Sequence, residues 1–218
     1  MTAMVDFAKA NEHHVLFCWD VLAAHFYGQP SPPSPFPADI ACPLFVTWNK
    51  EAGRGGHLQL RGCIGCLKPL FLSSLRDYTL TSALQDRRFP PIELSEMPRL
   101  HCAVELLGGF EACGLYDWTI GMHGLTIAFV DDATGGTARS AVYLPYVIPE
   151  QKWTQVEAID SLIRKSGCDA LITDELRASL RVTRFVSTKH GVSHEQWAAH
   201  RSQANTTPRS PHTVDGDR

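Results

Sequence analysis

Two glycine-rich turns constrain the fold of this chain more than any other feature. AGRGGH (52–57) joins the apolar segment LFVTW (44–48) to HLQLRGC (57–63), and DDATGGT (131–137) joins LTIAFV to SAVYLP. Strand-like segments joined this closely pair antiparallel, because a parallel pair needs a crossover of about a dozen residues. With LHCAVELL (100–107) and LRVTRFVS (180–187) as further strands, the sequence predicts an α+β fold with a mainly antiparallel sheet rather than a doubly wound one.

Helices should flank this sheet. Residues 15–28 have apolar side chains at helical spacing that predict one buried stripe, and residues 73–86 predict a second helix with a capping box of Ser74 and Asp77. Thr154 and Glu157 form another capping box, for a helix that ends at Gly167. Shorter helices are expected from Thr173 and over 194–201.

The chain divides into three parts by composition. Residues 1–14 read as an N-terminal extension, 15–201 as a single domain, and 202–218 as a disordered tail with almost nothing to bury. Within the domain, residues 29–43 form a proline-rich loop, because no helix or central strand tolerates prolines at this density.

Composition excludes several classes of protein. The formal net charge of -3 gives no electrostatic reason to expect nucleic acid or an anionic membrane as the main partner. The sequence has no apolar run of about 18 residues for a membrane span, and its start does not read as a secretory signal. Seven irregularly spaced cysteines favour free thiols in a reducing compartment, so we expect a cytoplasmic or nuclear protein.

The stretch LRGCIGC (60–66) allows four interpretations. Cys63 and Cys66 have the spacing of a redox pair at a strand-to-helix junction. A structural zinc site would need a second ligand pair, which the sequence does not offer, so we expect no metal. Cys63 alone could be a nucleophile, with Arg61 favouring the thiolate and the backbone at Gly62 and Gly65 holding an anionic group. The stretch could also be a tight packing turn around a buried thiol.

Four residues outside this stretch are further candidates. His123 lies between two glycines where a loop enters a strand, a position suited to a catalytic base or to a turn histidine bonded to nearby backbone. Tyr78 and Arg88 lie on or just after the second helix, and Tyr143 ends a strand before a proline. We take these three as candidate ligand contacts, with an ion pair or a core aromatic as the alternative.

Several motifs in order along the chain resemble the AMMECR-domain family. They are LRGCIG (60–65), PLFVTW (43–48), YTLTSAL (78–84), D-x-RFPP (86–91), EMPRL (96–100), DW-x-x-G-x-HG (117–124), YLP (143–145) and IDSL-x-RK-x-G (159–167). The resemblance covers about 15–201 and implies a compact fold of two interlocked lobes, built from the N- and C-terminal parts together. It also implies no agreed biochemical activity and an association with Memo-type or radical-SAM proteins. We expect no cofactor.

The chain departs from that family pattern at two positions. Cys66 stands where threonine is common, which weakens the redox and zinc interpretations and leaves Cys63 as the thiol of interest. Tyr146 stands where similar sequences often carry an acidic or amide residue. If that position touches a ligand, specificity here differs from that of its relatives.

Two hypotheses about function therefore stand side by side. In the first, the protein is a modification-type enzyme with Cys63 as nucleophile and His123 as base, acting on an unknown small molecule or protein. In the second, it is a non-catalytic binding or scaffold domain in which LRGCIG is structural. A thiol redox protein using Cys63 and Cys66 is a further alternative.

Overall fold

The computed structural model describes residues 8–53, 56–131 and 135–206. Its strands are β1 (Ala41–Ala52), β2 (His57–Phe71), β3 (Leu100–Cys113), β4 (Gly124–Asp131), β5 (Thr137–Tyr143) and β6 (Arg181–Ser193). Its helices are α1 (Glu12–Phe26), α2 (Leu75–Leu84), α3 (Val147–Gln151), α4 (Gln155–Lys165), α5 (Asp174–Ala178) and α6 (His194–Thr206), with short 3-10 helices η1 (Leu72–Ser74) and η2 (Leu94–Arg99).

The described strands form one antiparallel sheet in the order β2-β1-β3-β6-β4-β5. The predicted α+β class and antiparallel pairing are therefore confirmed. Both predicted hairpins are present, β1–β2 and β4–β5, while residues 54–55 and 132–134 at their turns lie outside the described residues.

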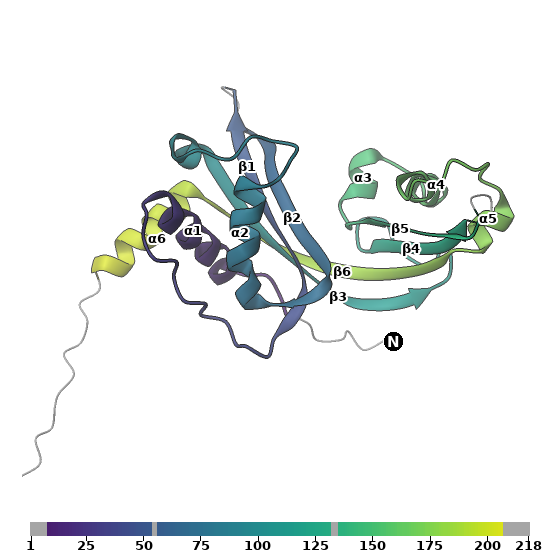
Figure 1. Ribbon diagram of the computed structural model, residues 1–218, viewed down its shortest axis with the longest axis horizontal. Helices are drawn as coiled ribbons and strands as arrows, with labels where there is room; N and C mark the ends of the chain where they lie inside the picture. The colour runs from purple at the N-terminus through teal and green to yellow at the C-terminus, as the bar shows by residue number, and fades with distance from the viewer. Residues whose placement is uncertain (1–7, 54–55, 132–134, 207–218) are drawn as a thin grey trace, which may run out of the picture.

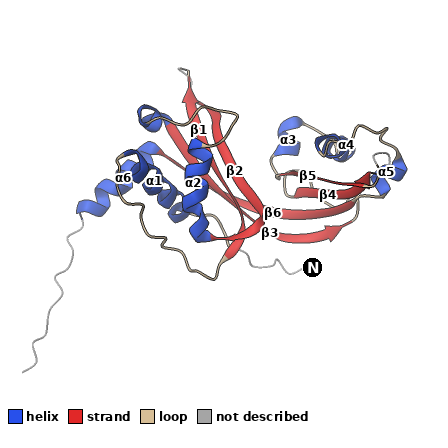
Figure 2. Ribbon diagram, in the orientation of Figure 1, coloured by secondary structure: helices blue, strands red, loops and turns tan. Residues whose placement is uncertain are grey.

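Two hydrophobic cores divide the molecule into two lobes. The first core lies between α1, α2, α6 and one face of β1, β3 and β6, and the second lies among β4, α3 and α4. Figures 1 and 2 show that the long strands β3 and β6 run through both lobes, with helices grouped at each end of the curled sheet. No helix in the described part of the chain is long and apolar enough to span a bilayer.

The first lobe brings together α1 and α6, which are far apart in the sequence. Trp19 of α1 stacks on Trp197 of α6 with ring centroids 5.5 Å apart, and the Trp197 indole N–H donates to Asp20 at 2.8 Å. Helix α6 continues to Thr206, past the start of the expected tail at Ser202, and residues 207–218 lie outside the described residues.

Helix α1 is buried more completely than the predicted single stripe. His14 is 5% exposed and stacks on Phe36 of the proline-rich loop, with centroids 4.8 Å apart. Burial lowers the pKa of His14, which therefore favours the neutral ring. The proline-rich loop covers a side of α1 that would otherwise face water, so the expectation of one buried stripe was too narrow.

The strand-to-helix junction predicted at Cys63 and Cys66 is wrong. Strand β2 runs through both cysteines to Phe71, and η1 rather than α2 follows it. The predicted capping box at Ser74 is also wrong, because Ser74 makes no side-chain cap hydrogen bond. The capping box of Thr154 and Glu157 is confirmed at the start of α4.

Candidate functional site

Cys63 and Cys66 point to opposite faces of the sheet. Successive side chains alternate along a strand, so residues three apart lie on different faces, with Cα atoms roughly 10 Å apart at about 3.3 Å per residue. A disulfide needs Cα atoms within about 7 Å. Both thiols are free, and an intact β2 does not allow them to form the disulfide of a redox pair.

Cys63 is held on three sides. The Thr47 hydroxyl on β1 donates to its sulfur at 3.1 Å. Its backbone N–H donates to the Asp86 carboxylate at 2.9 Å, and its carbonyl accepts from the Arg88 guanidinium at 3.1 Å. Because β2 is an edge strand, Asp86 and Arg88 take the place that a neighbouring strand would occupy.

Arg88 and Asp86 also pair with each other. The Arg88 guanidinium contacts both carboxylate oxygens of Asp86, at 2.9 and 2.6 Å. This hydrogen bonding lowers the pKa of Asp86 well below its usual range and outweighs the effect of burial, so the carboxylate stays ionised. Arg88 therefore has a structural partner, although 55% of its side chain is exposed.

The surroundings of the Cys63 thiol raise its pKa. Burial raises its pKa most strongly, and the negative charge of Glu105 raises it further. The hydrogen bond from Thr47 and the positive charges of Arg88 and Lys189 oppose this rise without overcoming it. A reactive cysteine usually has a lowered pKa, so this environment favours the neutral thiol.

Glu105 of β3 is the most unusual side chain near Cys63. It is 3% exposed, and its carboxylate accepts a 2.6 Å hydrogen bond from the Ser187 hydroxyl. Lys189 lies directly opposite it across the β3–β6 pair. Burial raises the pKa of Glu105, and the Ser187 hydrogen bond and the Lys189 charge only partly offset this effect.

Tyr146, just before α3, is a residue of the second lobe that contacts Lys189 of the first lobe, close to Glu105. Lys189 Nζ lies 4.9 Å from the centroid of its ring. Burial, followed by the charges of Glu105 and Cys63, raises the pKa of Tyr146 to about 12. We call the surface formed by Phe45, Thr47, Cys63, Glu105, Lys189 and Tyr146 the Cys63 face. Figure 1 shows β2 on the side of the first lobe that is nearest to α3.

The two glycines of LRGCIG allow close packing on either side of β2. A Cβ atom on Gly62 would lie 2.0 Å from the backbone oxygen of Ser82 in α2. A Cβ atom on Gly65 would lie 2.2 Å from the ring of Phe45. Both positions require glycine because other atoms already fill the space, which assigns them a packing role.

Arg61 is engaged in structural contacts. It is the extra residue of a β-bulge, since Trp48 pairs with Gly62 and Asn49 with Leu60. Its guanidinium contacts both carboxylate oxygens of Glu96 and donates to two backbone carbonyls, those of Pro90 and Pro91. Arg61 thus ties β2 to the RFPP segment and to η2, and it is not among the groups whose charges act on Cys63.

The remaining predicted site residues lie elsewhere. His123 Nδ1 accepts from the Thr119 backbone N–H at 2.9 Å, as a turn histidine does, and its charge is not among those that act on Cys63. Tyr143 packs in the second core and shares a 2.9 Å hydrogen bond with Ser161. Tyr78 packs against the first core, where burial and then the nearby Cys66 raise its pKa.

The structure adds residues that sequence reasoning missed. Glu105 and Lys189 complete the Cys63 face, and Glu105 is the single acidic residue in the mostly apolar segment LHCAVELL. That lone charge in a buried strand was an available signal. Across the described residues, no group of three or more His, Cys, Asp or Glu side chains is placed to hold a metal ion.

The fold defines the class: an antiparallel sheet shared by two helix-covered lobes, with LRGCIG on its edge strand. The chain belongs to the AMMECR1 family, whose model matches residues 15–190. An uncharacterised protein of Arabidopsis thaliana is 42% identical over 194 residues, which cover 88% of this chain and 89% of that protein. One of Schizosaccharomyces pombe, also uncharacterised, is 37% identical over 158 residues, covering 71% and 77%.

A solved structure has the same fold. The crystal structure of an uncharacterised protein from Pyrococcus horikoshii has a TM-score of 0.65 and 23% sequence identity. The match covers 85% of this chain and 93% of that one.

Proposed function

We propose that the protein is a binding domain whose ligand lies on the Cys63 face, with LRGCIG as the structural strand beneath it. One observation carries the proposal: the two lobes together place an acid, an amine, a phenol and a thiol on one surface. Glu105, Lys189 and Cys63 come from three strands of the first lobe, and Tyr146 comes from the second.

Glu105 supports a binding role. Burying a carboxyl group without an ion pair is unfavourable, and such groups gather at functional sites more often than in ordinary cores. The described contacts of Glu105 include one hydroxyl, from Ser187, and no ion pair. A ligand that donates hydrogen bonds or carries a positive group would give this carboxyl the partner it lacks.

The thiol supports the non-catalytic version of this role. A nucleophilic cysteine needs a base or a lowered pKa, whereas burial raises that of Cys63 and His123 bonds to its own loop. Thr47, Asp86 and Arg88 fix the residue in place. We therefore assign Cys63 to the wall of the site rather than to chemistry.

One observation favours a modification-type enzyme as the second candidate. The raised pKa of Glu105 suits an acid–base group, and its charge acts on Cys63. In that mechanism Glu105, rather than His123, would take the thiol proton.

A fragment screen followed by NMR tests the binding role. Fragments that bind should shift the backbone amide signals of Cys63, Glu105 and Lys189. Tyr146→Ala should weaken the binding of these fragments. Val156→Ala, which removes an exposed side chain on α4, is the control and should leave binding unchanged. The proposed site is wrong if the fragments shift amide signals only in other parts of the protein. It is also wrong if Tyr146→Ala changes the affinity of none of the fragments.

A further inference from the structure

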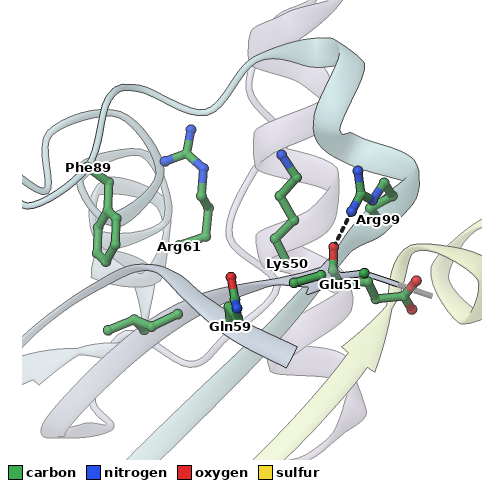
Figure 3. A pocket seen from close by; sticks show the side chains of 9 residues that line it. Lys50, Glu51, Gln59, Arg61, Phe89 and Arg99 are labelled. Carbon is green, nitrogen blue, oxygen red and sulfur yellow. Dashed lines mark hydrogen bonds between the residues drawn. The ribbon is translucent and has the colours of Figure 1, made fainter. Parts of the chain in front are cut away.

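A pocket of about 440 Å³ lies near the turn end of the β1–β2 hairpin, where Ala52 pairs with His57. Its walls include Lys50, Glu51, Gln59, Arg61, Phe89 and Arg99 (Figure 3). Arg61 belongs to LRGCIG, Phe89 to RFPP and Arg99 to EMPRL. Three motifs that are far apart in the sequence thus meet at one cavity, away from the residues of the Cys63 face.

Three cationic side chains line this pocket from three elements. Lys50 is on β1, Arg61 on β2 and Arg99 on η2, and Figure 3 shows their nitrogen ends on the same side of the hairpin. Glu96 forms ion pairs with Lys50 and Arg61, and Glu51 also lines the pocket. Three cationic side chains therefore stand against two carboxylates, which leaves an excess of one positive charge.

The surrounding contacts fix the cations without satisfying all of their donors. Glu96 forms ion pairs with Lys50 at 2.7 Å and with Arg61 at 2.8 Å, and these contacts restrict the positions of both side chains. The Lys50 ammonium has three N–H donors, one of which serves Glu96. Arg99 has five, and its one described hydrogen bond goes to the Glu51 carbonyl. Donors of Lys50 and Arg99 are therefore available to a ligand.

We propose that this pocket binds a small organic anion with a phosphate or carboxylate group. Lys50 and Arg99 would contact the anionic oxygens, because ammonium and guanidinium groups recognise such oxygens with charge-assisted hydrogen bonds. The Phe89 ring at the other end of the pocket would contact the apolar part of the ligand. Arg61, four of whose five N–H donors already bind protein acceptors, supplies fixed positive charge.

NMR titration of the full chain tests this proposal with three probes: phenyl phosphate, benzoate and inorganic phosphate, at constant ionic strength. Phenyl phosphate should shift the amide signals of Lys50, Gln59 and Arg61, and comparison with benzoate shows which anion is preferred. Lys50→Met and Arg99→Met should each weaken binding about tenfold, the usual effect of losing one charged hydrogen bond. Phe89→Leu should weaken the binding of phenyl phosphate and benzoate and leave the binding of inorganic phosphate unchanged.

Lys68→Met is the matched control, because it removes one exposed cation from the same strand, β2, outside the pocket. It should leave binding unchanged. Arg99→Lys, which keeps the charge, should restore part of the affinity lost in Arg99→Met. If Lys68→Met weakens binding as much as Lys50→Met, or if none of the probes shifts the pocket signals, the proposal is wrong. Neither result bears on the Cys63 face, which shares no residue with this pocket.

Discussion

At the scale of single residues, LRGCIG combines unusual residue types because each has a different neighbour. Gly62 gives space to α2, Arg61 binds Glu96, and Cys63 has its backbone held by Asp86 and Arg88. A stretch that suggests a reactive thiol or a tight turn is in fact part of a continuous strand that packs on α2 at Gly62.

Gly62→Ala should strongly destabilise the protein. Its new Cβ atom would lie 2.0 Å from the Ser82 carbonyl oxygen, which belongs to a helix backbone and cannot rotate away. We expect a loss of about 3 kcal/mol or more in the free energy of unfolding, measured by urea denaturation. Gly191→Ala on β6 is the control, since its nearest contact would be 3.6 Å and it should lose less than about 1 kcal/mol. Equal losses in the two variants would contradict the packing role of Gly62.

Glu96 should make stability depend on pH. Burial would raise its pKa, but hydrogen bonds from Arg61 and Lys50 outweigh burial and lower it to about 2, from an ordinary value of 4.5. Ionised Glu96 therefore stabilises the fold fully above pH 4.5, and this contribution disappears as the pH falls towards 2. Glu96→Gln should cost about 2 kcal/mol at pH 7 and almost nothing at pH 2, measured by denaturation across that range. A cost that does not change with pH would exclude this linkage.

At the scale of elements, the exposed edge of β2 is protected by side chains rather than by another strand. Asp86 and Arg88 follow α2 and bond to both backbone groups of Cys63. An unprotected edge strand can pair with another chain, so this contact also limits aggregation.

Asp86→Asn should loosen this edge. It removes the ion pair with Arg88 and weakens the acceptor for the Cys63 N–H. Hydrogen exchange at the Cys63 amide should accelerate by about tenfold or more, which corresponds to losing one charged hydrogen bond. Arg87→Ala, a neighbouring exposed change, should leave that amide unaffected. If exchange at Cys63 is the same in both variants, Asp86 does not protect the edge.

Elements with local signals could be predicted from the sequence, and those set by distant contacts could not. The Thr154–Glu157 capping box and the Gly167 stop lie close to the two ends of the 11-residue helix α4 and define it locally. In β2, glycines that usually mark turns are present because α2 and Phe45 press on the strand, which only the folded chain reveals. Of the Cys63 face, the sequence singled out Cys63 and Tyr146, whereas Glu105 and Lys189 reach it only through the pairing of β3 with β6.

At the scale of the whole molecule, two cores share two strands. The change from one lobe to the other falls at a bulge in β3, where Gly109 has a φ of 63° and Phe110 stacks on Phe185 of β6. Glycine adopts this left-handed conformation without strain, and the bulge bends the strand. The curl brings Tyr146 of the second lobe to Lys189 of the first.

The two lobes should therefore unfold together. Val104 lies in the first core and Ile127 in the second, on strands that pair with β6 in different lobes. Their amides should exchange with the same free energy of opening, measured by native-state hydrogen exchange. A lower value for either lobe would show that it opens separately, and the Cys63 face would then open with it.

The most direct test of the central claim is the pH dependence of alkylation at Cys63, resolved by peptide mass spectrometry. The claim is that Cys63 forms part of the wall of a binding surface and is not an activated nucleophile. It predicts slow alkylation in the folded protein, with a pKa above that of the same residue in the unfolded chain, because burial dominates. If Cys63 instead reacts fastest of the seven cysteines and titrates below its unfolded value, the binding account is contradicted and catalysis by Cys63 takes its place.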